Sequence, residues 1–462
     1  MADAKYNLQS GRTPEKIYSF SSGAKELLLG GPLNLLLVCT PFAFISYWAQ
    51  WPLPVTFVLS LLSIAPFAER LGYVTEQLAI HTNDTIGGLL NATFGNATEL
   101  IISLSALKNG LYRVIQLSLL GSILSNLLLV MGTAFFCGGL KFKTQTYGTI
   151  SGQINSTLLM IASLSLILPA VLTQTSEEND YDELTLSRVS SVILVSLYIC
   201  YLYFQLNTHR DAYEVESEEI KAHARRPPST DLEAELSTSS SGVTVGLIAN
   251  GSHSDGRSQS TNTRTISIGT GPLGPVRHSL TPGGGFTKLG GNGAEGDDDD
   301  DEEEDDILGF NFSILWLAVI TIFISFLSTF LVESIEATAE HVSGFFLSAI
   351  VLPIVGNAAE HASAIVFAMK NKLDLALGVA VGSSTQIAVF VLPFIVLCGW
   401  IADKPMSLNF HQFETATLLL SVITVTFAIK NGKSNWLVGA TLIAAYVVIA
   451  TGFLVHNNES LE

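Results

Sequence analysis

The chain has 462 residues, of which 48% are hydrophobic and only 14% are charged. Its 41 acidic and 23 basic residues give a net charge of −18, so the few charges are segregated along the chain. A charged fraction well below the roughly 25% of soluble domains excludes a soluble enzyme and a mostly disordered chain. The acidity excludes a nucleic-acid-binding protein, because a phosphate backbone would repel it. A membrane protein remains.

Long apolar runs predict the membrane-spanning part of the chain. A spanning helix needs about 20 largely apolar residues. The sequence contains eleven such segments, at residues 31–49, 53–69, 86–107, 111–138, 153–174, 187–206, 308–332, 343–369, 374–400, 412–430 and 434–456. We therefore expect an all-α polytopic membrane protein with about eleven transmembrane helices.

Residues 207–306 separate six of these segments from the other five. They are rich in Ser, Gly, Thr and Asp, and they end in ten consecutive acidic residues. This composition predicts a disordered linker.

The distribution of Lys and Arg predicts the orientation. With the N-terminus in the cytosol and the linker left out, eleven Lys and Arg residues fall on the cytosolic side and four on the other side. Because cytoplasmic loops carry the excess of positive charge, we expect the N-terminus and the linker to be cytosolic. An odd number of spans then places the C-terminus in a lumen.

Two similar motifs indicate an internal repeat. The pentad GNATE begins at Gly95, and GNAAEH begins at Gly356; each is followed 26 residues later by a Gly-Ser pair, at Gly121 and Gly382. The matching segments are five apart, so the two copies cross the membrane in opposite directions. Inverted repeats with interrupted helices are typical of secondary transporters.

The repeat defines the expected organisation. We expect a first transmembrane helix followed by two inverted five-helix repeats. The predicted parts are a cytosolic segment (1–30), the first helix (31–52), the first repeat (53–206), the linker (207–306), the second repeat (307–456) and a luminal C-terminus (457–462).

The ionisable residues at mid-span are Glu99, Glu360 and His361. A carboxylate at the centre of a bilayer costs about 2.5–3.5 kcal/mol on insertion scales. No Lys or Arg lies at that depth in the predicted spans. The partner of the two glutamates is therefore either a cation or a proton.

The surrounding residue types favour a cation that prefers oxygen ligands. Asn96 lies three residues before Glu99, and Asn357 lies three residues before Glu360, which places each amide on the helical face of its carboxylate. Further oxygens come from Ser122, Ser125, Asn126, Ser383, Ser384 and Gln386. Calcium takes six to eight oxygen ligands, whereas zinc and copper prefer softer Cys and His ligands. Manganese stays open as a second cargo.

The same carboxylates provide a means of coupling. An empty carboxyl group in a low-dielectric site tends to bind a proton, so calcium and protons compete for the same oxygens. His361, next to Glu360, is a candidate for modulating this competition.

These motifs, together with the stretches GGLLNATFGNATELIIS, VLPIVGNAAEH, GSILSN and GSSTQI, resemble the cation/proton exchanger (CAX) family of the calcium/cation antiporter superfamily. The resemblance extends from about residue 53 to residue 456 without the linker. It implies an eleven-helix vacuolar Ca²⁺/H⁺ antiporter that moves calcium from the cytosol into an acidic lumen.

The resemblance also implies roles for individual residues. Glu99 and Glu360 would be the shared ligands of calcium and protons. The residues lining the site would be Asn96, Asn357, Ser122, Ser383 and Gln386, with His361 as an adjacent tuning residue. Fungal vacuolar members have an acidic segment before the seventh helix. Here that segment is the uniform run at residues 297–306 inside a longer linker, which is a departure from the fungal pattern.

Two other transport functions stay open at this point. One is a sodium-coupled cation exchanger of the same superfamily, and the other is a cation channel. An enzyme is not expected, since the sequence contains no HExxH or GxSxG motif. The expected partners are Ca²⁺, H⁺ and the lipid bilayer, without nucleic acid and without a cofactor; the sequence does not predict the oligomeric state.

Overall fold

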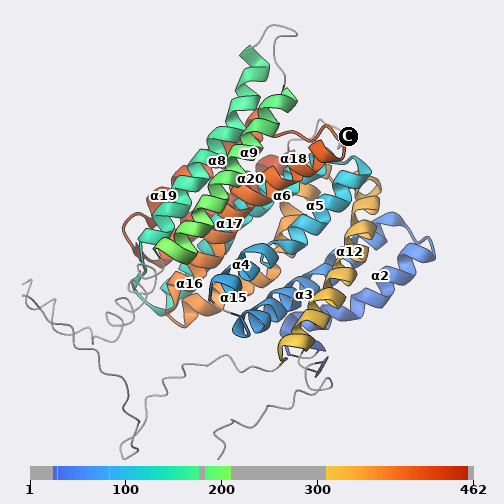
Figure 1. Ribbon diagram of the computed structural model, residues 1–462, viewed down its shortest axis with the longest axis horizontal. Helices are drawn as coiled ribbons and strands as arrows, with labels where there is room; N and C mark the ends of the chain where they lie inside the picture. Colours follow the sequence, from blue (N-terminus) through green and yellow to red (C-terminus); the bar gives the residue numbers. More distant parts are fainter. Residues whose placement is uncertain are drawn as a thin grey trace, which may run out of the picture. The chain divides into compact units, whose positions relative to one another are not determined.

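The computed structural model describes residues 24–25, 27–28, 30–82, 84–175, 183–209 and 308–455. They belong to one unit, formed by residues 1–226 and 306–462, and they are almost entirely helical (Figure 1). The predicted linker, except for residues 207–209, lies outside the described residues. The acidic run and the predicted C-terminal segment also lie outside them.

The first half of the unit runs from a short 3₁₀-helix to a helix that ends with a π-helical turn. Its elements are η1 (Pro32–Val38), α2 (Cys39–Trp48), α3 (Leu53–Ile80), α4 (Asp84–Phe94), α5 (Ala97–Asn109), α6 (Tyr112–Leu124), η2 (Ser125–Val130), α7 (Met131–Lys141), β1 (Gln145–Thr146), α8 (Ile150–Thr175), α9 (Glu183–Tyr203) and η3 (Phe204–Thr208).

The second half repeats the order of the long helices without a counterpart of α2, but its strand β2 lies before the last helix, whereas β1 lies before α8. Its elements are α12 (Phe310–Ala339), α13 (Gly344–Phe346), η4 (Leu347–Val351), α14 (Leu352–Gly356), α15 (Ala358–Met369), α16 (Leu373–Leu377), η5 (Gly378–Gly382), α17 (Ser383–Gln386), η6 (Ile387–Val391), α18 (Leu392–Ile401), α19 (Gln412–Ile429), β2 (Lys433–Ser434) and α20 (Trp436–Val455).

Helices from the two halves pack against each other. In Figure 1 the yellow α12 lies beside the blue α2 and α3, although more than 200 residues separate them in the sequence. Similarly, α8 packs against α19 and α7 packs against α20. The strands β1 and β2 form a two-stranded antiparallel ladder between loops of the two halves. The halves therefore share one apolar core.

The helix formed by α6, η2 and α7 lies in the middle of this core. Every residue of α6 from 114 to 124 is buried. A surface helix would be polar on one face; this one is apolar nearly all round, with a few small polar residues. The α6 helix is therefore surrounded by protein, and its polar side chains face other helices.

The described part of the chain contains eight helices that are long and apolar enough to cross a membrane, or nine if the bent pair Gly344–Gly356 and Ala358–Met369 is one span. This confirms the all-α membrane fold but not the count of eleven. The predicted first span at 31–49 is a shorter apolar helix, Leu33–Trp48. The predicted span at 86–107 is interrupted between α4 and α5.

Two helices are longer than the apolar runs that predicted them. The predicted span 53–69 belongs to α3, which continues to Ile80, and the predicted span 308–332 belongs to α12, which continues to Ala339. Hydropathy marks only the part of a helix in hydrocarbon, whereas backbone hydrogen bonds decide where the helix ends. Both helices therefore carry acidic residues beyond their apolar parts, including Glu76 and Glu333.

Candidate functional site

Both GNA motifs lie where a helix breaks. Asn96 separates α4 from α5 with φ −115° and ψ 24°, and Asn357 separates α14 from α15 with φ −92° and ψ 17°. Gly is a weak helix former, and Asn favours helix ends. The second break bends the chain by 52°. Each Asn therefore precedes the helix that carries its glutamate and does not lie inside a continuous span.

Each glutamate lies in the first turn of the helix after the break. Glu99 is the third residue of α5, and Glu360 is the third residue of α15. The N–H groups of the first turn have no partner within the helix, and the helix dipole is positive at this end. These positions therefore stabilise negative charge on a carboxylate or on a ligand bound beside it.

The asparagines at the breaks bond to the long helices of the opposite halves. Asn96 Nδ2 donates to Gln386 Oε1 at 2.7 Å, and Asn357 Nδ2 donates to Asn126 Oδ1 at 3.0 Å. Asn126 lies in η2 of the first half, and Gln386 lies in α17 of the second half. The two breaks therefore meet in one polar cluster between the halves.

Ser383 is the residue with the most polar contacts in this cluster. Its Oγ lies 2.9 Å from Asn96 Oδ1, 2.9 Å from Glu360 Oε1 and 3.2 Å from Asn126 Nδ2. The asparagine amide donates to the hydroxyl oxygen, while the other two neighbours are acceptors for its one hydrogen. Ser383 therefore joins Glu360 to residues of the first half.

Two oxygens of the cluster lack a hydrogen-bond donor. Glu360 Oε2 and Asn357 Oδ1 are buried, and neither has a partner among the described residues. A buried acceptor without a partner costs about 1–3 kcal/mol, and more when it is charged. A proton or a cation bound here would remove that cost.

Glu99 approaches the second half at its break. The position that a Cβ atom on Gly356 would occupy lies 3.9 Å from Glu99 Oε1. Ion pairs in the described part of the chain include Glu69 with Arg70 and Glu414 with Arg113, and none of the described residues forms an ion pair with Glu99 or Glu360. Both carboxylates are thus available to a bound ion.

Three other predicted residues have different surroundings. His361 Nε2 lies 3.2 Å from Ser125 Oγ. Ser122 is buried, and its hydroxyl forms no hydrogen bond with any described residue. Ser384 donates to the backbone oxygen of Ala380, at 2.8 Å, so it is not among the oxygens of the cluster.

Asn126 has a larger part in the cluster than its sequence position indicated. It contacts both Asn357 and Ser383, although it has no counterpart in the second repeat, where Ile387 occupies the corresponding place. Asn126 therefore does not stand out as one of the matched residues of the two repeats. A buried Asn in an apolar run is nevertheless a signal, because a polar residue inside a membrane helix needs a partner.

The cluster is suited to a hard cation. In the described residues no group of three or more His, Cys, Asp and Glu side chains comes together. The available ligands are two carboxylates with amide and hydroxyl oxygens, which is the ligand type of calcium, magnesium and manganese.

Comparison with known proteins identifies the family. Residues 52–207 and 312–455 match the family described as "Sodium/calcium exchanger protein". The chain belongs to this family. The matched ranges contain both breaks and every residue of the cluster. The protein is therefore a membrane transporter and not an enzyme.

Relatives with a similar full length are plant cation/proton exchangers. The "Vacuolar cation/proton exchanger 3" of Oryza sativa subsp. japonica is 41% identical over 456 residues, which cover 97% of this chain and 92% of the relative. The "Vacuolar cation/proton exchanger 5" of Arabidopsis thaliana is 41% identical and covers 98% of this chain and 88% of the relative. The predicted resemblance to cation/proton exchangers is confirmed. The comparison with fungal members stays a prediction.

A solved structure with the same fold is that of YfkE. It matches with a TM-score of 0.64 and 31% identity, and the match covers 92% of this chain and 99% of YfkE. A second structure of YfkE, described as a Ca²⁺/H⁺ antiporter protein, matches with a TM-score of 0.62 and 32% identity. This match covers 91% of the present chain and 98% of YfkE. These matches confirm the transporter fold.

Proposed function

We propose that the protein is a Ca²⁺/H⁺ antiporter that moves cytosolic calcium into the vacuole in exchange for protons. The names of its relatives and of YfkE support this function. The observation that carries the proposal is the buried cluster at the two helix breaks. There, Glu360 Oε2 and Asn357 Oδ1 lack donors, and both glutamates lack basic partners among the described residues.

Calcium is the cation that this ligand set fits best. Glu99 and Glu360 supply two negative charges, which balance the charge of one divalent cation. The amide oxygen of Asn357, the Ser383 hydroxyl and water complete an irregular oxygen shell, which calcium tolerates. Manganese, a smaller hard cation, is the competitor that the transport test includes.

A proton on Glu360 is the natural alternative to calcium. The single hydrogen of Ser383 Oγ serves either Asn96 Oδ1 or Glu360 Oε1, which are both 2.9 Å away. When Glu360 Oε1 carries a proton, it donates to Ser383, and Ser383 donates to Asn96, so both contacts are satisfied. Calcium binding needs the same carboxylate without its proton. The two ions therefore exclude each other at Glu360.

Transport requires that the cluster reach one side of the membrane at a time. The cluster joins the halves through hydrogen bonds of Asn96 with Gln386 and Ser383, and of Asn126 with Asn357 and Ser383. A movement of one half against the other changes which face reaches the glutamates, as in other transporters with repeated halves. In the proposed orientation the N-terminus is cytosolic, the C-terminus is luminal, and eleven segments cross the membrane.

The proposal is tested by calcium uptake into acid-loaded vesicles that contain the purified protein. We expect uptake that stops when a proton ionophore collapses the gradient. Glu99→Gln and Glu360→Gln should each abolish it, because an amide neither balances the calcium charge nor binds the proton. Glu336→Gln is the matched control, since Glu336 is an exposed carboxylate of α12, and its uptake should be unchanged.

Other outcomes would identify a different transporter. The family description includes sodium, so uptake that needs a sodium gradient and ignores pH would replace the proposal with sodium-coupled exchange. Uptake that persists after the proton gradient has collapsed would indicate a channel. Uptake preserved in both glutamate variants would remove the proposed site. Competition by Mn²⁺ measures the cation preference.

A further inference from the structure

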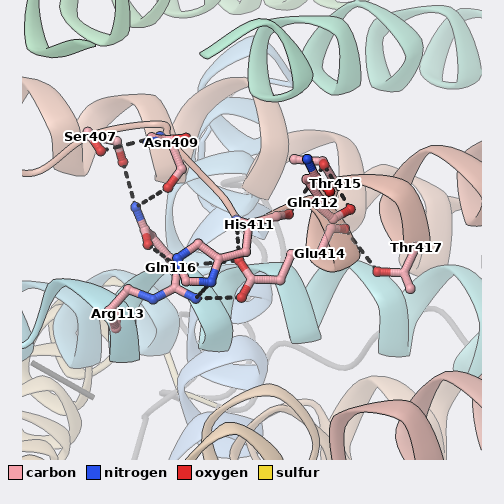
Figure 2. Close-up of polar contacts among 9 residues, drawn as sticks. All are labelled: Arg113, Gln116, Ser407, Asn409, His411, Gln412, Glu414, Thr415 and Thr417. Carbon is pink, nitrogen blue, oxygen red and sulfur yellow. Dashed lines mark hydrogen bonds and ion pairs between the residues drawn. The ribbon is translucent and has the colours of Figure 1, made fainter. Parts of the chain in front are cut away.

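A second polar cluster lies where α6 and α19 begin (Figure 2). Arg113, near the start of α6, and Glu414, in the first turn of α19, form an ion pair with Nη2–Oε1 at 2.5 Å and Nη1–Oε2 at 3.3 Å. The side chain of Glu414 is 1% exposed and that of Arg113 is 12% exposed. A two-pronged ion pair of this burial has a well-defined geometry.

Neighbouring residues hold both partners in place. Gln116 Oε1 accepts from Arg113 Nη1 at 2.5 Å, and Gln116 Nε2 donates to the backbone oxygens of Ser407 and Asn409 (Figure 2). The backbone N–H of His411 donates to Glu414 Oε2 at 3.1 Å. The loop before α19, in the second half, is therefore attached to α6 of the first half.

The ion pair lies at the start of α6, the helix that continues into η2 and its cluster residue Asn126. Ser122 follows Arg113 by nine residues, a rise of about 13–14 Å along α6. Ser118, Ser122 and Ser125 follow one another at helical spacing and form a polar stripe towards the cluster. On the other side, Arg113 Cζ lies 5.6 Å from the ring of Phe345, in α13 at the start of the segment that leads to Asn357.

Between the ion pair and the cluster, the two halves are in direct contact. A Cβ atom on Gly121 would lie 2.1 Å from the backbone oxygen of Ala349 and 2.6 Å from Pro353 Cγ. The backbone of α6 thus touches the segment before the second break, with no space for an ion between them. At this contact, α6 and the segment before the second break are closed against each other.

We propose that the Arg113–Glu414 ion pair is a latch that holds the two halves closed over the ion site on this face. Opening the site to this face requires α6 to move away from the segment before Asn357, and that movement separates the two charges. Arg113 and Glu414 are positioning residues that act through α6 and do not touch the transported ion. The inference rests on the alternating access of the proposed function.

The latch is tested by chemical labelling of a cysteine at position 118. Ser118 is 7% exposed and lies on the polar stripe between the latch and Ser122. Ser118→Cys is introduced after replacement of the native cysteines, Cys39, Cys137, Cys200 and Cys398, by Ala. A membrane-impermeant methanethiosulfonate reagent is then applied to each face of the vesicles, and its reaction rate is measured.

We expect Glu414→Gln to raise the labelling rate about tenfold or more from one face only, because removing one partner of a buried ion pair shifts the closed state by more than one factor of ten. Glu69→Gln is the matched control. Its ion pair with Arg70, at 2.8 Å, joins two residues of α3 and not the two halves, so the labelling rate should stay unchanged. An unchanged rate in Glu414→Gln, or an equal rise from both faces, would overturn the latch.

A double variant separates opening from misfolding. Arg113→Gln with Glu414→Gln removes both charges and leaves no unpaired charge in the interior. Size-exclusion chromatography should show it folded, and its labelling rate should be as high as that of Glu414→Gln. A folded double variant with the original slow labelling would refute the latch.

The labelling assay does not depend on calcium transport. If acid-loaded vesicles fail to take up calcium while labelling responds to Glu414→Gln, the proposed antiport is wrong and the latch stands. If uptake occurs and labelling does not respond, only the latch is wrong.

Discussion

The two halves carry the same motifs but make different contacts. Glu360 bonds to Ser383 at 2.9 Å, whereas the equivalent pair in the first half, Glu99 and Ser122, has no such bond in the described residues. Gly121 is pressed against the backbone of the other half, while the equivalent Gly382 has no atom within 4 Å of the position of an added Cβ.

This difference shows that repeated sequence does not mean repeated surroundings. Both copies of the motif contribute to the cluster. In this conformation only the first copy, at Gly121, is in close contact with the backbone of the other half. In the proposed antiport, an exchange of these roles between the halves would accompany alternating access. The predictions that follow compare equivalent residues.

The largest difference is expected between the two glycines of the Gly-Ser pairs. Gly121→Ala should destabilise the protein by about 1–3 kcal/mol, because overpacking at a close contact forces the backbone to shift. Gly382→Ala should be neutral or stabilising by up to about 1 kcal/mol, because Ala is the better helix former. The measurement is the fraction that stays monodisperse after heating in detergent. Equal losses in the two variants would contradict the observed asymmetry.

The next difference is expected between the two serines. Ser383→Ala removes the donor from Asn96 Oδ1 and Glu360 Oε1 and should reduce proton-driven calcium uptake about tenfold, as a loss of ~1–3 kcal/mol predicts. Ser122→Ala removes no hydrogen bond in the described structure, so its uptake should change by less than about twofold. Initial uptake rates at several calcium concentrations distinguish the variants. A larger effect at Ser122 would reverse the proposed roles of the halves.

The smallest difference is expected four residues after each glycine, at Ser125 and Gln386. Gln386→Ala leaves Asn96 Nδ2 without its acceptor, and a loss of ~1 kcal/mol predicts about a fivefold lower uptake. Ser125→Ala removes the contact with His361 at 3.2 Å and a contact with the Tyr446 side chain, neither of which involves a glutamate, and we expect less than about a twofold change. The same initial-rate assay applies. Matching effects would show that the two positions are equivalent despite their different contacts.

Many of the residues in the cluster could be predicted from the sequence. The spacing of the GNA and Gly-Ser motifs predicted which residues would lie together, and Asn96, Asn357, Ser383, Gln386 and Glu360 do meet in one cluster. The pattern was readable because each repeat places its polar residues in an otherwise apolar helix, where they stand out.

The contacts between distant segments could not be predicted from the sequence. Arg113 and Glu414 are 301 residues apart and lie at the ends of predicted spans, where charged residues usually face water. No local pattern distinguishes a solvated charge from one buried against a partner.

Apolar length and the repeated motifs were enough to predict the membrane class and the transporter family, and to propose which residues form an ion site, since hydropathy and sequence symmetry are properties of the chain alone. The packing of the two halves settled the rest. It determined that Ser383 and not Ser122 bonds a glutamate, and that an ion pair joins α6 to α19. These features depend on which surfaces meet in space, because a close contact or a buried charge is stable only with its partner in place.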